Sequence, residues 1–275
     1  HTAKAGVLGR LASIIAGRGA TRIHTFHGHL LHGYFSGWKT SLVIAIEKFL
    51  AKRTHFLVAI GNEVKQDLLS AGIGSPAQYK VFFPGLPAPH TAGKAELRQK
   101  LGLDAAKIYC TFVGRLTQIK RPDRLLDIAS AMQARGVALE FLVAGEGELF
   151  AQSQTRAKSE NLPVTFLGWR KDIDDLFAAS DIAILTSDNE GIPLTLIQAA
   201  QAGLPIIAPK VGSISDIVEN DVTGFLTSPA PGAMASALSA LATDEKLRIQ
   251  LGGAGKKRAS ELFSLERMLR DHTEI

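Results

Sequence analysis

Short apolar runs alternate with amphipathic segments along nearly the whole chain. A solid apolar run is typical of a strand that is buried on both faces, whereas apolar positions three and four residues apart indicate a helix. In the first third of the chain the pattern predicts helices at 3–16, 38–52 and 63–71 and strands at 22–26, 56–60 and 80–83. We expect Asn62 to cap the third of these helices.

The alternation restarts beyond residue 107 and continues toward the C-terminus. The predicted strands are 108–113, 139–144, 164–167, 182–186, 204–208 and 225–226. The predicted helices are 122–135, 148–160, 173–179, 193–202, 232–242 and 245–262. Strands and helices that alternate in this way form a parallel sheet with helices on both faces, so the sequence predicts an α/β protein.

A stretch rich in proline and glycine separates the two series of elements. Residues 84–89 read Pro-Gly-Leu-Pro-Ala-Pro. Three prolines in six residues cannot extend a helix or a central strand. We therefore expect a linker here, between one domain at 1–88 and a second that begins at 89.

The composition is that of an ordinary globular protein: of 275 residues, 46% are hydrophobic and 21% charged. The most apolar stretch, at 41–51, contains Glu47 and Lys48 and is shorter than the ~20 residues that span a membrane. The single cysteine, Cys110, excludes a disulfide framework and favours a reducing, cytoplasmic compartment. The net charge of +5 favours an anionic partner, and with 7% aromatic residues nucleic acid is the weakest candidate.

The loop after the strand at 108–113 carries the first candidate chemistry. In parallel sheets, ligands bind beyond the carboxyl ends of the strands. Gly114 lets a ligand approach the backbone, Arg115 and Lys120 are cationic, and Pro122 begins a helix whose N-terminus is partly positive. Together they predict a site for a diphosphate; the alternative is a solvated basic loop.

The loop after the strand at 182–186 carries the second set of candidate binding residues. Glu190 stands just before a helix begun by Pro193 and is able to accept hydrogen bonds from sugar hydroxyls. The backbone amides of Gly191 and Ile192 are able to face phosphate oxygens. Gln198, eight residues beyond Glu190, is able to contact a ribose. The alternative is that Glu190 is an acid stabilised by the helix N-terminus.

A set of short motifs occurs in order along the chain. They are Phe-Val-Gly-Arg-Leu at 112–116 with Lys120, Phe-Leu-Gly-Trp-Arg at 166–170, Ala-Ser-Asp at 179–181, Glu-Gly-Ile-Pro at 190–193, Ala-Gly-Leu-Pro at 202–205 and Val-Thr-Gly-Phe-Leu at 222–226. This set resembles the C-terminal half of the retaining glycosyltransferases of the GT-B fold, in the large family four (glycosyl transferases group 1). His-Thr-Phe-His-Gly-His at 24–29 resembles part of the N-terminal domain of that family.

The resemblance implies two Rossmann-like parallel-sheet domains. Residues 1–88 would form a partial N-terminal, acceptor-side domain and 89–262 the C-terminal domain that binds the nucleotide sugar. Residues 263–275 would form a helix that packs back on the N-terminal domain. The first strand and glycine-rich loop of the family would precede His1. We therefore expect an N-terminally truncated chain, and the resemblance leaves its own activity open.

Four residues carry the catalytic roles that the resemblance implies. Arg115 and Lys120 would hold the diphosphate, Glu190 would contact the donor sugar, and His27 would face that sugar across the cleft. The other implied donor-binding residues are Gly114, Gly145, Trp169, Arg170, Gly191, Ile192, Leu194, Thr195 and Gln198. Gln198 replaces the second acid of the family's Glu-x7-Glu signature, so we expect an altered contact with the nucleoside.

The function that the resemblance implies is that of a retaining glycosyltransferase, a hexosyltransferase that moves a sugar from a nucleotide-diphosphate donor such as a UDP-sugar to a glycan or lipid-linked acceptor. Its expected place is bacterial surface polysaccharide biosynthesis, in the cytoplasm and at the inner face of the plasma membrane. We expect no cofactor and no metal requirement. The alternatives are a UDP-sugar 2-epimerase of the same fold and a non-catalytic sugar-nucleotide-binding fragment.

Three further patterns have weaker interpretations. Four histidines between residues 24 and 32 favour no metal site, because no acids cluster with them. Asp172-Ile173-Asp174 resembles a metal-binding D-x-D motif, but acids at the start of a helix indicate capping. Gly145-Glu146-Gly147 lacks the third glycine of a dinucleotide fingerprint, since residue 150 is Phe.

The segment 34–53 is basic and amphipathic. Its cations are Lys39, Lys48, Lys52 and Arg53, interleaved with aromatic and aliphatic residues. Such a helix either lies on an anionic membrane or packs its apolar stripe on the sheet, and the sequence leaves both open.

Overall fold

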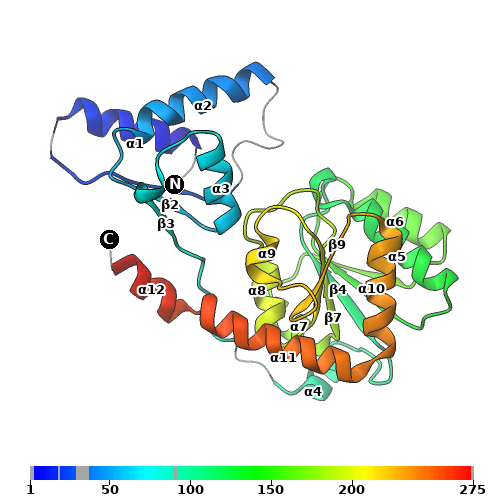
Figure 1. Cartoon of the computed structure of the whole chain (residues 1–275). Coiled ribbons are helices and arrows are strands. Elements are labelled where there is room, and N and C mark those ends of the chain that lie inside the picture. Colours follow the sequence, from blue (N-terminus) through cyan, green and yellow to red (C-terminus); the bar gives the residue numbers. More distant parts are fainter. Residues whose placement is uncertain (1–2, 18, 29–36, 90–91, 274–275) are drawn as a thin grey trace.

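The computed structural model describes residues 3–17, 19–28, 37–89 and 92–273, which form two parallel sheets with helices around them (Figure 1). The first sheet has the order β1-β2-β3. Its elements are α1 (Ala3–Ile15), β1 (Ile23–Phe26), α2 (Gly37–Ala51), β2 (Phe56–Ala59), α3 (Asn62–Ser70), the 3-10 turn η1 (Pro76–Gln78) and β3 (Tyr79–Val81). We call residues 3–81 the first lobe.

The second sheet has the order β6-β5-β4-β7-β8-β9, with every pair parallel. Its strands are β4 (Tyr109–Val113), β5 (Glu140–Ala144), β6 (Val164–Gly168), β7 (Ile182–Ile184), β8 (Ile206–Pro209) and β9 (Gly224–Thr227). The α/β class predicted from the alternating pattern is confirmed, and so are the two parallel sheets that the resemblance implies. We call residues 94–262 the second lobe.

Helices cover both faces of the second sheet. The helices are α4 (Lys94–Lys100), α5 (Pro122–Ala134), α6 (Phe150–Ser159), α7 (Ile173–Ala179), α8 (Leu194–Gln201), α9 (Ile214–Ile217), α10 (Pro231–Thr243) and α11 (Glu245–Leu262), with a 3-10 turn η2 (Gln118–Lys120). α5 packs beside α6 and α10 on one face, while α4, α7, α8 and α11 follow one another on the other. The short helices α4 and α9 were not among the elements predicted from periodicity.

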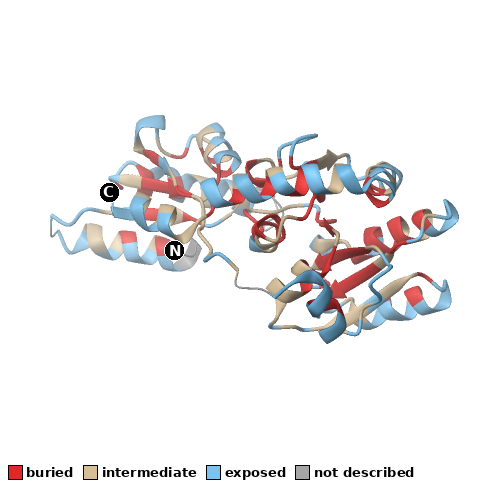
Figure 2. Ribbon diagram, turned by 90° about the horizontal axis from the view of Figure 1, so that it is seen from below, coloured by how far each residue is buried: buried red, intermediate tan, exposed pale blue. Residues whose placement is uncertain are grey.

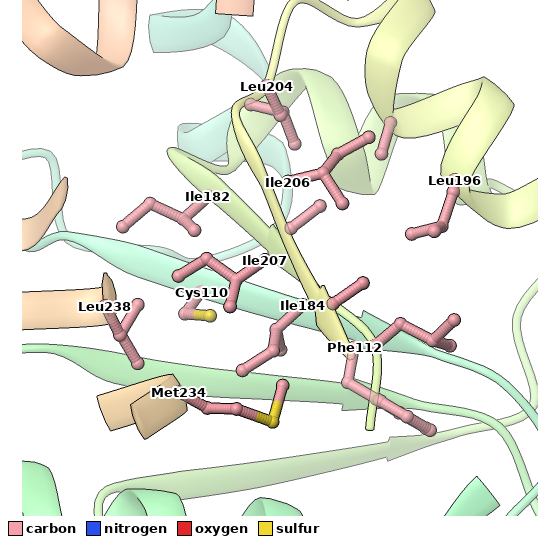
Figure 3. Close-up of a cluster of buried hydrophobic side chains, with 14 of the residues drawn as sticks. Cys110, Phe112, Ile182, Ile184, Leu196, Leu204, Ile206, Ile207, Met234 and Leu238 are labelled. Atoms are coloured by element: carbon pink, nitrogen blue, oxygen red, sulfur yellow. The ribbon is translucent and has the colours of Figure 1, made fainter. Parts of the chain in front are cut away.

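One large core cluster joins the second sheet to its helices, and a smaller cluster of Tyr109, Leu142, Ala144 and Leu176 lies beside α7. Phe112 of β4, Ile207 of β8 and Leu238 of α10 are completely buried in the large cluster (Figure 3). Cys110 points into the same cluster, and its burial raises the pKa of the thiol well above the ordinary value. The strands lie between two helical layers, which explains why their sequences are apolar on both faces.

The expected cap of α3 is wrong in its details. Gly61, not Asn62, takes the N-cap position, and Asn62 is the first helical residue. The side chain of Asn62 donates a hydrogen bond to Asp216 of the second lobe instead. The side-chain amide of Asn62, which we expected to cap α3, therefore bonds to the second lobe instead.

The segment 84–89 leads from the first sheet toward the second. The C-terminal helix α12 (Leu265–Thr273) lies beside the start of this segment. The backbone NH of Leu86 donates to Phe263 and its carbonyl accepts from Leu265, at 2.9 and 3.1 Å. Arg267 of α12 donates to the carbonyl of Phe83, just after β3, at 2.6 Å. These bonds tie α12 to the chain that leaves the first sheet.

Candidate functional site

Three loops meet at the carboxyl edge of the second sheet, where the sequence pattern directed attention. The loop after β4 pairs with the loop after β5, because the NH of Leu116 donates to the carbonyl of Glu146 at 2.9 Å. It also pairs with the loop after β7, because the NH of Asp188 donates to the carbonyl of Ile119 at 2.9 Å. The two candidate loops thus form one surface.

Two glycines allow the loops after β4 and β5 to come this close. A Cβ on Gly145 would lie 2.0 Å from the carbonyl oxygen of Gly114, and one on Gly147 would lie 2.4 Å from that of Leu116. Gly145 also has φ of 136°, in the region that favours glycine. Loop packing therefore explains these glycines without a dinucleotide.

Lys120 and Glu190 form an ion pair at the centre of this surface. The Oγ of Ser187 donates to the same Oε1 of Glu190 at 2.6 Å. The two charged side chains are 20% and 10% exposed, so water has limited access to them. The structure thus brings together the ammonium and the carboxylate that the sequence analysis selected 70 residues apart.

Hydrogen bonds from the strand edge hold Lys120 in place. The Oγ1 of Thr186, which is completely buried, donates to the backbone carbonyl of Lys120 at 2.8 Å. Next to it, Arg121 adopts a left-handed conformation with φ of 53° and pairs with Asp123 and Asp188. These hydrogen bonds raise the pKa of Arg121, and the one from Arg121 lowers the pKa of Asp123. The turn that presents Lys120 is therefore fixed at both ends.

Arg115 and the residues of the α8 region lie around the ion pair with different exposures. Arg115 begins the same loop as Lys120, but its side chain is exposed and stands outside the pair with Glu190. Gly191 and Thr195 are half-buried, whereas Leu194 is 47% exposed. Ile192 is buried and belongs to the core, so its side chain supports the loop and only its backbone remains a candidate contact.

The first lobe approaches this surface at Gly191. A Cβ on Gly191 would lie 3.2 Å from the carbonyl oxygen of His27 and 3.3 Å from the Cα of Gly28. His27 directly follows β1, so the carboxyl ends of both sheets face one another here. Its side chain is exposed at this junction, and partial desolvation lowers the pKa of the imidazole. The predicted His27 thus stands across from the Glu190 loop.

A second junction between the lobes lies beside the first. The carboxylate of Asp216, in α9, accepts hydrogen bonds from the backbone NH and the Nδ2 of Asn62, at 2.8 and 2.7 Å. Asp216 is 7% exposed. A Cβ on Gly61 would lie 2.6 Å from the Oγ of Ser213, so the approach requires glycine at that position. An acid of one lobe therefore satisfies the start of a helix of the other.

The residues at the outer end of the sheet have mixed roles. Trp169, just beyond β6, is 64% exposed and available to a ligand. Arg170 pairs with Asp172, and the hydrogen bond lowers the pKa of that carboxyl. Asp172 takes the N-cap position of α7 as expected but forms no capping hydrogen bond, because its carboxylate is engaged by Arg170.

Gln198 of α8 is turned toward α7. Its Nε2 donates to Oδ1 of Asp174 at 2.9 Å, so a contact between this amide nitrogen and a ribose would have to replace that bond. The second acid of the D-x-D pattern is thereby engaged as well. Among the described ranges, no group of three or more His, Cys, Asp and Glu residues is placed to hold a metal ion.

The histidine-rich segment is described only in part. His29 and His32 lie outside the described residues. His24 packs edge-on against Phe26 with ring centroids 4.5 Å apart, and it is 6% exposed. Burial, and then the nearby Arg10 guanidinium, lowers the pKa of His24 to about 3. His24 is therefore a neutral member of the first lobe's interior.

Sequence reasoning missed two residues of this region. Ser187 follows β7 and lies three positions before Glu190, a signal that would have marked it as a hydrogen-bond donor to that acid. Asp216 gave no signal, because α9 spans four residues and its partner Asn62 is 154 positions away.

Comparisons with known proteins agree on one family. The family model described as glycosyl transferases group 1 matches residues 93–258. The UDP-Gal:alpha-D-GlcNAc-diphosphoundecaprenol alpha-1,3-galactosyltransferase of Escherichia coli is 31% identical over 82% of this chain, which spans 60% of that protein's length. The putative glycosyltransferase EpsD of Bacillus subtilis is 27% identical over 98% of this chain and 74% of its own length.

Solved structures share the fold of this chain. The HepE protein of Anabaena in complex with UDP superposes with a TM-score of 0.87 at 26% identity, covering 99% of this chain and 76% of its own. The complex of HepE with UDP-glucose gives a TM-score of 0.86 at 25% identity, covering 99% of this chain and 76% of its own.

Proposed function

The chain belongs to the family of glycosyl transferases group 1, and from that premise we propose that it takes part in retaining transfer of a sugar from a UDP-sugar to a glycan or lipid-linked acceptor. The observation that carries the proposal is the Lys120–Glu190 ion pair at the carboxyl edge of the second sheet, opposite His27 of the first lobe. HepE, which is 25–26% identical to this chain, has been crystallised with UDP and with UDP-glucose.

Lys120 has the central role toward the diphosphate. A phosphate oxygen is a ligand for the ammonium that competes with Glu190, so donor binding exchanges one anion for another at the same nitrogen. Arg115, exposed in the same loop, supplies a second cation. As the bond between the sugar C1 and the phosphate oxygen breaks, both cations stabilise the charge that builds on the leaving diphosphate. The scheme needs no metal and no cofactor.

Glu190 and His27 position the sugar. Once Lys120 has turned to the phosphate, the Glu190 carboxylate, still held by Ser187, accepts hydrogen bonds from sugar hydroxyls. The acceptor hydroxyl oxygen bonds to C1 through an oxocarbenium-like transition state, and its proton leaves with the diphosphate. No protein nucleophile is part of the scheme.

In this proposal residues 1–88 are the acceptor side, 89–262 bind the donor and 263–275 pack back on the acceptor side. The similar Escherichia coli enzyme is named for an acceptor linked to diphosphoundecaprenol. We therefore assign a lipid-linked glycan as acceptor, reached in the cytoplasm at the anionic inner face of the plasma membrane, and a role in surface polysaccharide synthesis.

Calorimetric titration with UDP, GDP and their sugars tests donor binding. A transfer assay with a polyprenyl-diphosphate-linked sugar tests the reaction, and repeating it with EDTA tests whether a metal ion is needed. We expect UDP binding and a product whose anomeric configuration, determined by NMR, matches the donor. Interconversion of free UDP-sugars would instead identify an epimerase. Donor binding without transfer would identify a binding module.

A further inference from the structure

A row of apolar side chains runs along the outer face of α2. Trp38, Leu42, Ile46 and Phe49 follow at spacings of four, four and three residues, which places them on one side of the helix. Their exposed fractions are 70, 53, 36 and 48%. We call these four residues the outer row. Single exposed apolar residues are ordinary, but a continuous row marks an interaction surface.

The outer row is not the face that packs on the sheet. Leu50 and Ala51 of α2 are completely buried, and Ala51 shares a core cluster with Leu57 of β2. Glu47 is 1% exposed and pairs with Arg10 of α1 at 2.7 Å. In Figure 1, α2 lies at the upper edge of the first lobe, away from α8 and α9. The inner face of α2 is therefore packed against the first lobe, while its outer face remains apolar and exposed.

Cations border the outer row. Lys39 and Lys52 lie on either side of it at helical spacing, and both are exposed. The Arg53 guanidinium lies 4.0 Å from the centroid of the Phe49 ring, and the Nζ of Lys39 lies 5.7 Å from that of Trp38. The one acid of α2 is Glu47, which is buried, so the charged side chains exposed on this helix are all cations.

Charge is divided unevenly between the two parts of the chain. Residues 1–88 contain 10 Lys and Arg against 3 Asp and Glu, a net charge of +7, while residues 89–275 contain 21 against 23, a net charge of −2. The entire positive excess therefore lies in the part that carries α2. Such a charge repels a second copy of the same surface and attracts an anionic one.

We propose that the outer row of α2 docks on an anionic phospholipid bilayer, with its apolar side chains at the level of the headgroups and Lys39, Lys52 and Arg53 on lipid phosphates. Aromatic side chains with one polar flank suit that interface. None of the described helices has the length and apolar character to cross a bilayer. The purpose of docking, access to a lipid-linked acceptor, rests on the proposed function. The docking surface itself follows from the exposure and charge of α2.

Flotation with vesicles of phosphatidylglycerol and phosphatidylcholine, compared with pure phosphatidylcholine, tests the proposal. We expect binding to the anionic vesicles and at least tenfold weaker binding of the double variant Trp38→Ser with Phe49→Ser. The matched control is Ile249→Ser with Val222→Ser, two exposed apolar residues of the second lobe, which should bind like the wild type.

A charge variant keeps the test informative if the apolar variant folds poorly. Lys39→Gln with Lys52→Gln should weaken binding to anionic vesicles roughly 25-fold, since each cation contributes about fivefold. Lys246→Gln with Lys257→Gln, two exposed lysines of α11, should leave binding unchanged.

Fluorescence gives a residue-specific readout. The chain has two tryptophans, Trp38 and Trp169. In a Trp169→Phe variant, anionic vesicles should shift the emission of Trp38 to shorter wavelength, and brominated lipid should quench it.

Four outcomes would overturn the proposal: no flotation of the wild type, equal losses in variant and control, unchanged emission of Trp38, or a dimer in solution that the outer-row variant dissociates without any vesicle binding. UDP affinity is measured in parallel on every variant. Intact UDP binding with no vesicle binding rejects the docking surface alone, and the reverse rejects the donor site alone.

Discussion

The two lobes share a parallel α/β plan but differ in where their apolar side chains lie. In the second lobe the strands are buried between helices, and the core joins both helical layers to the sheet. In the first lobe the sheet has three strands, α2 is largely exposed, and α1 mixes exposed with half-buried residues. Figure 2 shows the strands of the second sheet in red, the colour of buried residues. The outer row of the first lobe stays in contact with solvent. One lobe thus holds its apolar side chains in a core, and the other leaves a row of them exposed.

The lobes also use charge differently. The second lobe places Lys120 and Glu190 together, partly shielded, in an ion pair at the carboxyl edge of its sheet. The first lobe spreads positive charge over an exposed helix face. The first arrangement suits a small, highly charged ligand, and the second suits an extended anionic surface.

The sharpest contrast comes from the same substitution in each lobe. Phe112→Ala, in the core of the second lobe, should lower the free energy of unfolding by about 3–5 kcal/mol. Phe49→Ala, on the outer row, should lower it by less than about 0.5 kcal/mol, because the side chain is already half in water. Chemical denaturation of both variants measures the difference, and similar losses would refute the division between core and surface.

Lys120→Ala should have the largest effect on ligand binding. We expect UDP affinity to fall by about 1.5–3 kcal/mol, the contribution of a charge-assisted hydrogen bond. Lys107→Ala is the matched control, because Lys107 pairs with Glu140 at the opposite, amino end of the same sheet. Calorimetry compares them; if the two variants bind UDP equally, the carboxyl edge is not the donor site.

The first lobe should lose stability in acid through His24. Its pKa is about 3 in the folded chain and its ordinary value is about 6.5, so unfolding takes up a proton between these values. The stability is fully present above pH 6.5 and is lost as the pH falls toward 3. At pH 5 the loss is about 2 kcal/mol. Hydrogen exchange of first-lobe amides, compared in wild type and His24→Gln, should show this slope in the wild type alone.

Ser187→Ala should have the smallest effect. The hydroxyl holds one oxygen of Glu190, and its loss should reduce UDP-sugar affinity by about 0.5–1.5 kcal/mol. Ser187→Thr keeps the hydroxyl and should recover most of the loss. A threonine variant as weak as the alanine variant would show that the hydroxyl does not position Glu190.

The sequence predicted the parts of the molecule that local pattern determines. Apolar periodicity located the strands from β1 to β9 within a few residues, and the rule that ligands gather at carboxyl ends selected Lys120 and Glu190. It failed at Asn62, whose partner Asp216 is brought near by the packing of one lobe on the other. It also missed that α2 keeps a second apolar face, because periodicity alone does not tell which side of a helix meets the sheet.

The measurement that tests the donor site most directly is the ratio of the Kd for uridine to the Kd for UDP. If Lys120 and its neighbours bind the diphosphate, UDP should bind at least about tenfold more tightly than uridine in the wild type and in Lys107→Ala. Lys120→Ala should lose most of that preference. Equal affinity of the wild type for uridine and UDP would contradict the account.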